Sequence, residues 1–270
     1  MQILLAILLA ASGTRVVETH GAKLSIETFG HGPPVVFLHG GMTFFDNAFA
    51  KQRDFFAAAH TVIGIDQRGH GHSPDGPWKL SYPQMAEDTA AILEKLALGP
   101  VDLVGHSDGA DIALLVARDH PKLVRRVVIS GANLRSEVSA QDLQQRATWP
   151  AEPAAGKVRE LAARLPAWFR ADYARVSPDG ADHYLTMLAK CYELWGTPVV
   201  MEAADLKKIS APVLVMAGDH DFSSIEDTTE IFRGLQHGRL FILPKTGHGT
   251  FTERPELVNL AIQSFLDEKD

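Results

Sequence analysis

Short, mostly apolar runs recur along the chain between segments with helical patterns, and this alternation constrains the fold more than any other feature. The runs are Val35–Leu38, Thr61–Ile65, Val101–Val104, Val124–Ile129, Pro212–Ala217 and Leu240–Leu243. Runs of this kind suit parallel strands that are buried on both faces. Strands that alternate with helices predict an α/β protein, with a mostly parallel central sheet flanked by helices on both faces.

Helices are predicted between these runs. Ser81 and Gln84 form a capping-box pattern ahead of apolar residues that share one helical face. Three further helices are predicted at Ala110–Asp119, Glu226–Leu235 and Pro255–Leu266. Near the N-terminus, the β-branched runs Thr14–Thr19 and Ala22–Thr28 flank His20-Gly21, which predicts a hairpin.

Residues 134–200 interrupt the alternation. They contain no convincing strand and are rich in Ala, Arg, Leu and Trp, with scattered prolines. This composition predicts several short helices inserted between two core strands, where α/β folds place their binding crevice. The chain then divides into a core of residues 14–133 and 201–270 and an insertion of residues 134–200.

Residues 1–13 have a different character. An apolar run from Ile3 to Ala11 is too short to span a bilayer. The run and the small residues at its end fit a cleaved signal peptide, although no Lys or Arg precedes it. The run fits equally well as a first strand, or as an upstream start of a cytosolic chain. A signal peptide would make the protein periplasmic or secreted, and either alternative would leave it cytoplasmic.

Length, charge and cysteine content exclude several classes of protein. A chain of 270 residues buries enough surface to fold as one large domain without disulfides or metal. Its 26 Lys and Arg against 33 Asp and Glu give a net charge of −7, which argues against nucleic-acid binding. The single cysteine, Cys191, excludes an internal disulfide framework. No stable membrane association is expected, and the sequence does not determine the oligomeric state.

A serine in a glycine-rich turn is the strongest sign of chemistry. Gly105-His106-Ser107-Asp108-Gly109 lies between the run Val101–Val104 and the predicted helix at Ala110. In this strand–turn–helix context, Gly-x-Ser-x-Gly holds its serine on a sharp, strained turn at the head of a helix. The helix N-terminus favours developing negative charge. Ser107 is therefore the predicted nucleophile.

A nucleophilic serine needs a base and a group that orients the base. His248 follows the run Leu240–Leu243 and is the predicted base. Asp219 and Asp221 both follow the run that ends at Ala217, and either one fits as the orienting acid. We favour Asp221, because it lies further from the strand end.

Backbone N–H groups are predicted to stabilise the negative oxygen of the reaction intermediate. His39-Gly40-Gly41-Met42 follows the run Val35–Leu38. An N–H group of this loop and the N–H group after the nucleophile are the pair that such a site needs. We assign them to Gly41 and Asp108.

These motifs resemble those of the α/β-hydrolases, and in particular serine esterases with a helical cap. Two further stretches match: 66–73, Asp-Gln-Arg-Gly-His-Gly-His-Ser, and 253–256, Glu-Arg-Pro-Glu. The resemblance extends from about Val16 to Leu266. It implies the α/β-hydrolase fold, with residues 134–200 as the cap. It also implies that the orienting acid is the second of the pair, Asp221.

One group within this family is similar in a further respect. Asp108 directly after the serine, and Gly131-Ala132-Asn133 after the next strand, resemble the valacyclovir hydrolase (biphenyl hydrolase-like) group. In that group the acid after the serine anchors the substrate's α-amino group, although this chain has Ala110 where the group has a further Gly. The resemblance implies a preference for amino esters. The alternative is that Asp108 packs against the turn and contributes only its N–H group.

Several other residues are weighed for binding roles. Met42, Trp149, Trp168 and Trp195 are candidate substrate-binding residues, and the tryptophans fit equally well as a small core of the cap. His70-Gly71-His72 lacks the spacing of a metal site, so no metal and no cofactor are expected. Cys191 is expected to be a packing residue, because no histidine shares a motif with it.

The sequence thus predicts a serine hydrolase that cleaves small carboxylic esters through an acyl-enzyme intermediate. Its partner would be a small-molecule ester. A lactonase, a C–C bond hydrolase or a cofactor-free perhydrolase would use the same residues on another substrate. A ligand receptor with this fold and very slow turnover is the alternative from a different class.

Overall fold

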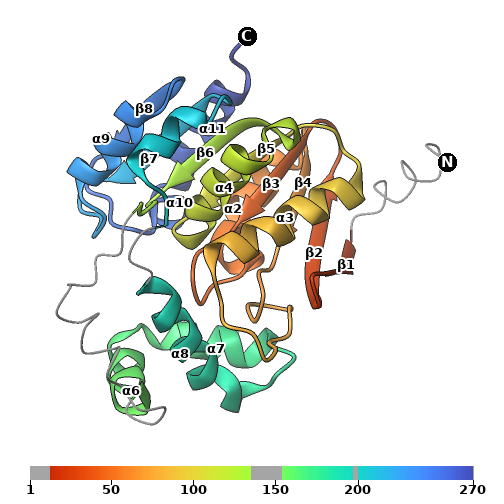
Figure 1. Cartoon of the computed structure of the whole chain (residues 1–270), viewed down its shortest axis with the longest axis vertical. Helices are drawn as coiled ribbons and strands as arrows, with labels where there is room; N and C mark the ends of the chain where they lie inside the picture. The colour runs from red at the N-terminus through yellow and green to blue at the C-terminus, as the bar shows by residue number, and fades with distance from the viewer. Residues whose placement is uncertain (1–12, 135–153, 197–199, 270) are drawn as a thin grey trace.

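The computed structural model describes residues 13–134, 154–196 and 200–269, and it shows a central sheet with helices on both faces (Figure 1). Eight strands form this sheet in the order β1-β2-β4-β3-β5-β6-β7-β8. They are β1 (Gly13–Thr19), β2 (Ala22–Gly30), β3 (Pro34–Leu38), β4 (Thr61–Ile65), β5 (Val101–His106), β6 (Val124–Ser130), β7 (Val213–Gly218) and β8 (Gly238–Leu243). β1 pairs antiparallel with β2, and β2 pairs antiparallel with β4. The six strands β4, β3, β5, β6, β7 and β8 are parallel to one another. The predicted α/β fold with a mostly parallel sheet is confirmed.

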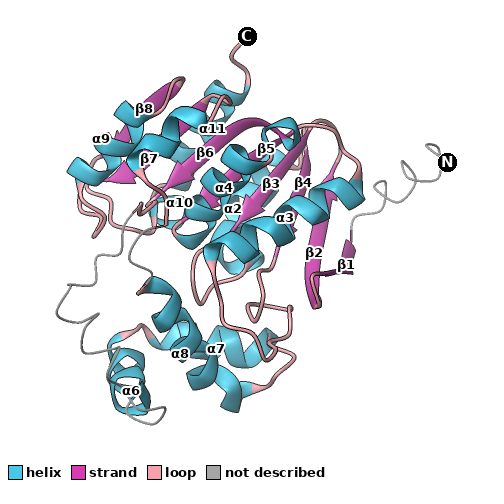
Figure 2. Cartoon of the chain, viewed as in Figure 1, coloured by secondary structure: helices cyan, strands magenta, loops and turns pink. Residues whose placement is uncertain are grey.

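Helices cover both faces of the sheet (Figure 2), and alternating residues of the strands pack against them in two hydrophobic cores. Val36 and Leu38 face the core that includes residues of α3 (Tyr82–Leu96), α4 (Asp108–Asp119) and α9 (Ile225–Gly234). Val35 and Phe37 face the opposite core. That core includes residues of α2 (Phe45–Phe56), α10 (Thr250–Glu253) and α11 (Pro255–Leu266). The period of two along each strand therefore anchors a helical layer on each side of the sheet.

Local signals in the sequence explain where several elements begin. Ser81 accepts a hydrogen bond from the backbone N–H group of Gln84 at 3.3 Å and caps α3 as predicted. His20 and Gly21 both adopt positive φ and form the turn of the predicted hairpin. Helix α2 was not predicted. Its Phe49 has non-helical angles (φ −131°, ψ 18°), so the helix is kinked, and three of its buried residues are phenylalanines, which are weak helix formers.

Among the described residues, three α-helices lie between β6 and β7 and project from one side of the molecule (Figure 1). They are α6 (Ala154–Arg164), α7 (Ala167–Val176) and α8 (Tyr184–Trp195), and we refer to them as the cap. Asp75 of the core joins them by accepting hydrogen bonds from Lys190 at 2.7 Å and from His183 at 2.8 Å.

Some predictions fall outside the described residues. The apolar N-terminal run and Trp149 are both in segments that the structure does not describe. Among the described helices, none has both the length and the apolar character that a membrane crossing requires.

Candidate active site

Ser107 occupies a strained backbone position between β5 and α4. Its angles are φ 53° and ψ −124°, a region that costs a non-glycine residue free energy. A Cβ atom on Gly109 would lie 1.9 Å from the carbonyl oxygen of Leu38, and one on Gly105 would lie 2.2 Å from the carbonyl oxygen of Gly109. The turn therefore excludes side chains at both glycines, which explains the Gly-x-Ser-x-Gly pattern.

His248 and Asp221 meet at the ends of two neighbouring strands. The Nδ1 atom of His248 donates a hydrogen bond to Oδ1 of Asp221 at 2.8 Å, and the Asp221 side chain is fully buried. Asp219 instead accepts a hydrogen bond from the backbone N–H group of Thr246 at 3.0 Å and holds the turn after β8. Of the two acids that the sequence left open, Asp221 is the one bonded to the histidine.

Three neighbours fix the position of His248. The Nε2 atom of His106 donates a hydrogen bond to the carbonyl oxygen of His248 at 2.7 Å. Burial lowers the pKa of His106 to about 3, so this ring stays neutral. The ring of Phe222 packs on the imidazole of His248 with their centroids 4.0 Å apart. A Cβ atom on Gly131 would lie 2.6 Å from Cε1 of His248, so only glycine leaves room for the ring.

A buried hydrogen-bonded chain supports the loop that carries Asp221. The backbone N–H group of Ser223 donates to Oδ1 of Asp221 at 3.1 Å, and its Oγ donates to Oδ1 of Asn133 at 2.8 Å. The N–H group of Asn133 in turn donates to Asp111 at 2.9 Å. Burial raises the pKa of Asp111 well above its ordinary value. Sequence reasoning gave Ser223 and Asp111 no role, although Ser223 stands two residues after Asp221.

Ser107 and His248 line one cavity of about 590 Å³ between the core and the cap. Gly40, Gly41 and Phe251 line it from the core. A cavity of this size accommodates a small-molecule ligand. It therefore brings the predicted nucleophile and base to the same ligand-sized space.

The glycine loop after β3 also reaches this cavity. His39 donates from Nδ1 to the carbonyl oxygen of Gly40 at 2.8 Å and accepts the N–H group of Gln67 at Nε2 at 2.9 Å. Burial lowers the pKa of His39, in keeping with this neutral form. Gly41 lines the cavity, whereas Met42 is buried and its N–H group bonds to Cys191. Within the loop, Gly41 is thus better placed than Met42 to donate to a ligand.

The carboxyl group of Asp108 already has two donors within the protein. Tyr82 Oη donates to it at 2.9 Å and Trp195 Nε1 at 3.1 Å, and burial raises its pKa. Asp108 is the first residue of α4, so its N–H group has no acceptor within the helix. The side chain therefore links the serine turn to the cap, while the backbone N–H group stays close to Ser107.

The other residues that the sequence predicted for the pocket differ in whether they line the cavity. Trp168 lines the cavity, whereas Trp195 is engaged with Asp108. Asn47 and Asp172 also line the cavity and were not predicted. Asn47 lies on the unpredicted α2, and no sequence motif marks Asp172.

Cys191 and His70 form a buried contact between the cap and the core. The Cys191 thiol donates to Nε2 of His70 at 3.3 Å, and His70 donates from Nδ1 to the carbonyl oxygen of Arg68 at 2.8 Å. Burial raises the pKa of Cys191 and lowers that of His70 to about 3, so both groups are neutral at pH 7. The sequence offered no histidine partner for this cysteine, because the two residues are far apart in the chain.

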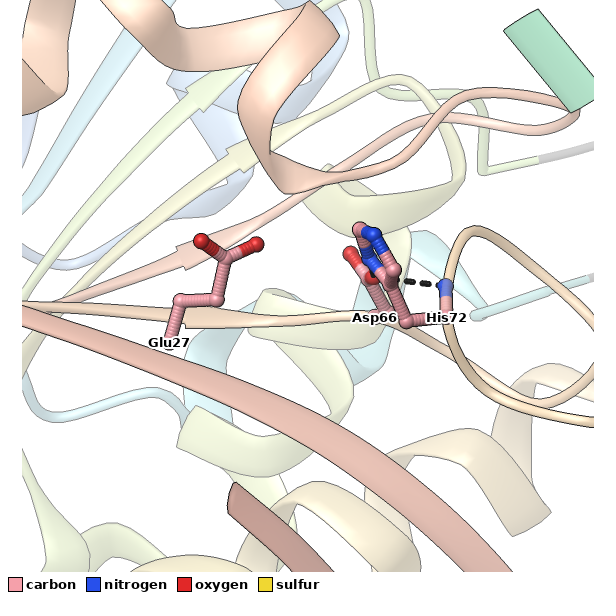
Figure 3. A group of neighbouring side chains, drawn as sticks. All are labelled: Glu27, Asp66 and His72. Atoms are coloured by element: carbon pink, nitrogen blue, oxygen red, sulfur yellow. Dashed lines mark hydrogen bonds and ion pairs between the residues drawn. The ribbon is translucent and has the colours of Figure 1, made fainter. Parts of the chain in front are cut away.

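Glu27, Asp66 and His72 form the one group of metal-binding side chains found among the described residues (Figure 3). Each offers one ligand atom, and these atoms lie within 4.8 Å of one another. Asp66 accepts hydrogen bonds from the N–H group of Phe45 and from both the N–H group and Nδ1 of His72, each at 2.9 Å. These bonds tie the loop after β4 to the start of α2, which gives the cluster a structural role.

Comparison with known proteins identifies the family of this chain. The model of the alpha/beta hydrolase family matches residues 35–261. The chain is 27% identical over 247 residues to (E)-2-((N-methylformamido)methylene)succinate hydrolase of Acinetobacter baylyi, covering 88% of this chain and 92% of that protein. It is 28% identical over 261 residues to the sn-1-specific diacylglycerol lipase of Mus musculus, covering 87% of this chain and 81% of that protein. A solved esterase from Thermogutta terrifontis superposes with a TM-score of 0.69 at 24% identity, covering 95% of this chain and 98% of that one. Because the family match spans most of the chain, this protein belongs to the alpha/beta hydrolase family.

Proposed function

We propose that this hydrolase cleaves small carboxylic esters, with Ser107 as nucleophile, His248 as general base and Asp221 as the acid that orients the base. The observation that carries the proposal is the bond from His248 Nδ1 to the buried Asp221, beside a strained serine in the same cavity. With its Nδ1 proton held by Asp221, His248 presents Nε2 as the basic nitrogen. Ser107, His248 and Asp221 would thus supply the nucleophile, the base and the orienting acid that the reaction needs.

In the first half of the reaction, Ser107 Oγ attacks the ester carbonyl and transfers its proton to Nε2 of His248. The buried Asp221 stabilises the imidazolium that forms. The N–H groups of Gly41 and Asp108 donate to the negative oxygen of the tetrahedral intermediate. His248 then protonates the leaving alcohol, and an acyl group remains on Ser107.

In the second half, His248 accepts a proton from water, and the resulting hydroxide attacks the acyl group. Collapse of the second tetrahedral intermediate releases the carboxylic acid and returns the proton to Ser107. The cap limits the access of water and supplies aromatic side chains to the cavity. Apart from the substrate and water, each step proposed here uses side chains and backbone groups of this chain.

An ester substrate is favoured by two observations. The cavity of about 590 Å³ fits a small ester. A relative that aligns over 87% of this chain is named as a lipase, and lipases cleave carboxylic esters.

The first test replaces Ser107 with Ala. We expect kcat for p-nitrophenyl butyrate to fall about 10⁶-fold, because the nucleophile and the base act as a unit. Labelling by a fluorophosphonate should disappear as well. The matched control is Ser264→Ala, which alters an exposed serine on α11 and should leave both measurements unchanged.

Two results would contradict the proposal. Undiminished ester turnover by the Ser107→Ala protein would exclude this serine as the nucleophile. A single acylation without further turnover in the unaltered protein would favour a slow ligand receptor over an enzyme.

A further inference from the structure

One face of α7 presents three side chains to the cavity that contains Ser107. Trp168, Phe169 and Asp172 all line this cavity. Asp172 is four residues after Trp168 and three after Phe169, so the three side chains share one side of the helix. The cap thus places two aromatic rings and a carboxylate opposite the predicted nucleophile.

The carboxylate of Asp172 has capacity to accept further hydrogen bonds. Its Oδ2 accepts one from Nδ2 of Asn47 at 3.2 Å, and its Oδ1 accepts one from Arg175 at 3.0 Å. A carboxylate offers about four acceptor positions, so two contacts do not exhaust it. The Arg175 side chain is 58% exposed, and exposed ion pairs of this kind contribute little free energy. A cationic ligand can therefore compete with Arg175.

The aromatic rings suit the same kind of ligand. Trp168 stacks on Phe169 with their centroids 3.9 Å apart and is 47% exposed. The face of an indole ring attracts ammonium and guanidinium groups, and a neighbouring carboxylate adds to this attraction. Among the described residues that line the cavity, Asp172 is the only carboxylate, and none is Lys or Arg. The electrostatic field in the cavity therefore favours ligands that carry a positive charge over ligands that carry a negative charge.

We propose that Trp168 and Asp172 form a subsite for a positively charged group of the substrate, so that the preferred substrates are esters bearing an ammonium or guanidinium group. This inference rests on the proposed ester hydrolysis. It does not use Asp108, whose carboxyl group is held by Tyr82 and Trp195.

The test compares esters that differ only in charge. p-Nitrophenyl 4-(trimethylammonio)butanoate and p-nitrophenyl 5,5-dimethylhexanoate have the same shape and place the charge in the acyl part. Butyrylcholine and 3,3-dimethylbutyl butyrate form the equivalent pair for the alcohol part. In at least one pair we expect kcat/KM to be about fivefold higher for the cationic ester, the ratio that about 1 kcal/mol gives for one partly exposed charge pair. Added salt should reduce that ratio.

Two variants of α7 should move the ratio in opposite directions. Asp172→Asn keeps an oxygen for Asn47 but removes the charge, and it should bring the ratio to about one. Arg175→Gln removes the competing cation and should raise the ratio above that of the unaltered protein. Glu160→Gln is the matched control, because it removes one negative charge from an exposed side chain on α6 that does not line the cavity. It should leave the ratio unchanged.

The possible results separate the two proposals. Hydrolysis of the neutral esters without any preference for the cationic ones would overturn the subsite and leave the esterase function standing. A cation preference that survives Asp172→Asn in a correctly folded protein would also overturn the subsite. If none of the four esters is hydrolysed, both proposals fail.

Discussion

The two sides of the cavity are built in different ways. On the core side, backbone atoms are so close together that a Cβ atom on Gly109 would meet the carbonyl oxygen of Leu38 at 1.9 Å. On the cap side, exposed side chains of α7 form the wall, and a Cβ atom on Gly156 of α6 would meet nothing within 4 Å. The core side is fixed by backbone packing, whereas the cap side depends on side chains that are exchangeable at small cost.

Because of this difference, we expect the core side to determine the rate of the chemical step and the cap side to determine which substrate is preferred. Ser107 and the glycine loop take their positions from strand ends, where the buried sheet leaves the backbone little freedom. Trp168 and Asp172 stand on one helix of the cap, where Trp168 is 47% exposed and Asp172 meets the core through Asn47. Changes on the core side should therefore affect rate and stability strongly, and changes on the cap side should mainly affect which substrate is preferred.

After loss of the nucleophile itself, the largest effect that we expect on the core side follows replacement of Asp221. Asp221→Asn should reduce kcat about 10⁴-fold, because the amide favours the wrong tautomer of His248. Asp219→Asn is the matched control; its side-chain oxygen still accepts the N–H group of Thr246, so kcat should stay close to that of the unaltered protein. Equal losses in both variants, measured by steady-state kinetics, would contradict the assignment of the acid.

A pair of glycine replacements tests the comparison of the two sides directly. Gly109→Ala should lower the free energy of unfolding by at least about 3 kcal/mol, because the new methyl group collides with backbone that cannot move aside. Gly156→Ala should instead raise it by up to about 1 kcal/mol, since alanine is the better helix former and the space is open. Urea unfolding measures both values, and similar losses at the two positions would show that the cap is packed as tightly as the core.

The last effect that we expect depends on pH and concerns the contact between His70 and Cys191, where the two sides meet. The folded state lowers the pKa of His70 from its ordinary 6.5 to about 3. Below pH 6.5, His70 therefore binds a proton in the unfolded chain but not in the folded one. This difference lowers the free energy of unfolding by about 1.4 kcal/mol per pH unit as the pH falls towards 3.

The measurement is urea unfolding between pH 4 and pH 7 for the unaltered protein and for His70→Gln. Comparing the two proteins cancels the contribution of groups that both contain, among them His106. The variant should lose less stability on acidification. Parallel pH profiles would contradict a buried, neutral His70.

Much of the fold was predictable because its signals are local. Each of the six runs lies in a strand, and the inner strands β3, β4 and β7 are buried along nearly their whole length, as their apolar sequences predict. Helix α2 was missed, because its formation depends on the packing of its phenylalanines against β3 and on Phe251 rather than on helix propensity. The strained turn at Ser107 was anticipated from the two glycines together with their position between a strand and a helix, because such a sharp turn leaves no room for neighbouring side chains.

The roles of individual acids were much less predictable. Asp219 and Asp221 look alike in sequence, and only the position of His248 distinguishes them. Asp108 stands next to the nucleophile in the chain, yet its carboxyl group bonds to Tyr82 and Trp195. Asp172 carries no motif and reaches the cavity only because α7 packs over the core.

The strands of the sheet, their order along the chain and the turn that holds Ser107 were predictable, because periodicity and glycine positions act over a few residues. The acid that bonds to His248, the groups that bond to Asp108 and the side chains of the cap that line the cavity became known from the folded structure. Those outcomes depend on contacts between residues that are far apart in the chain. Such contacts are set by how helices and strand ends pack together, and the pattern of any one segment does not contain them.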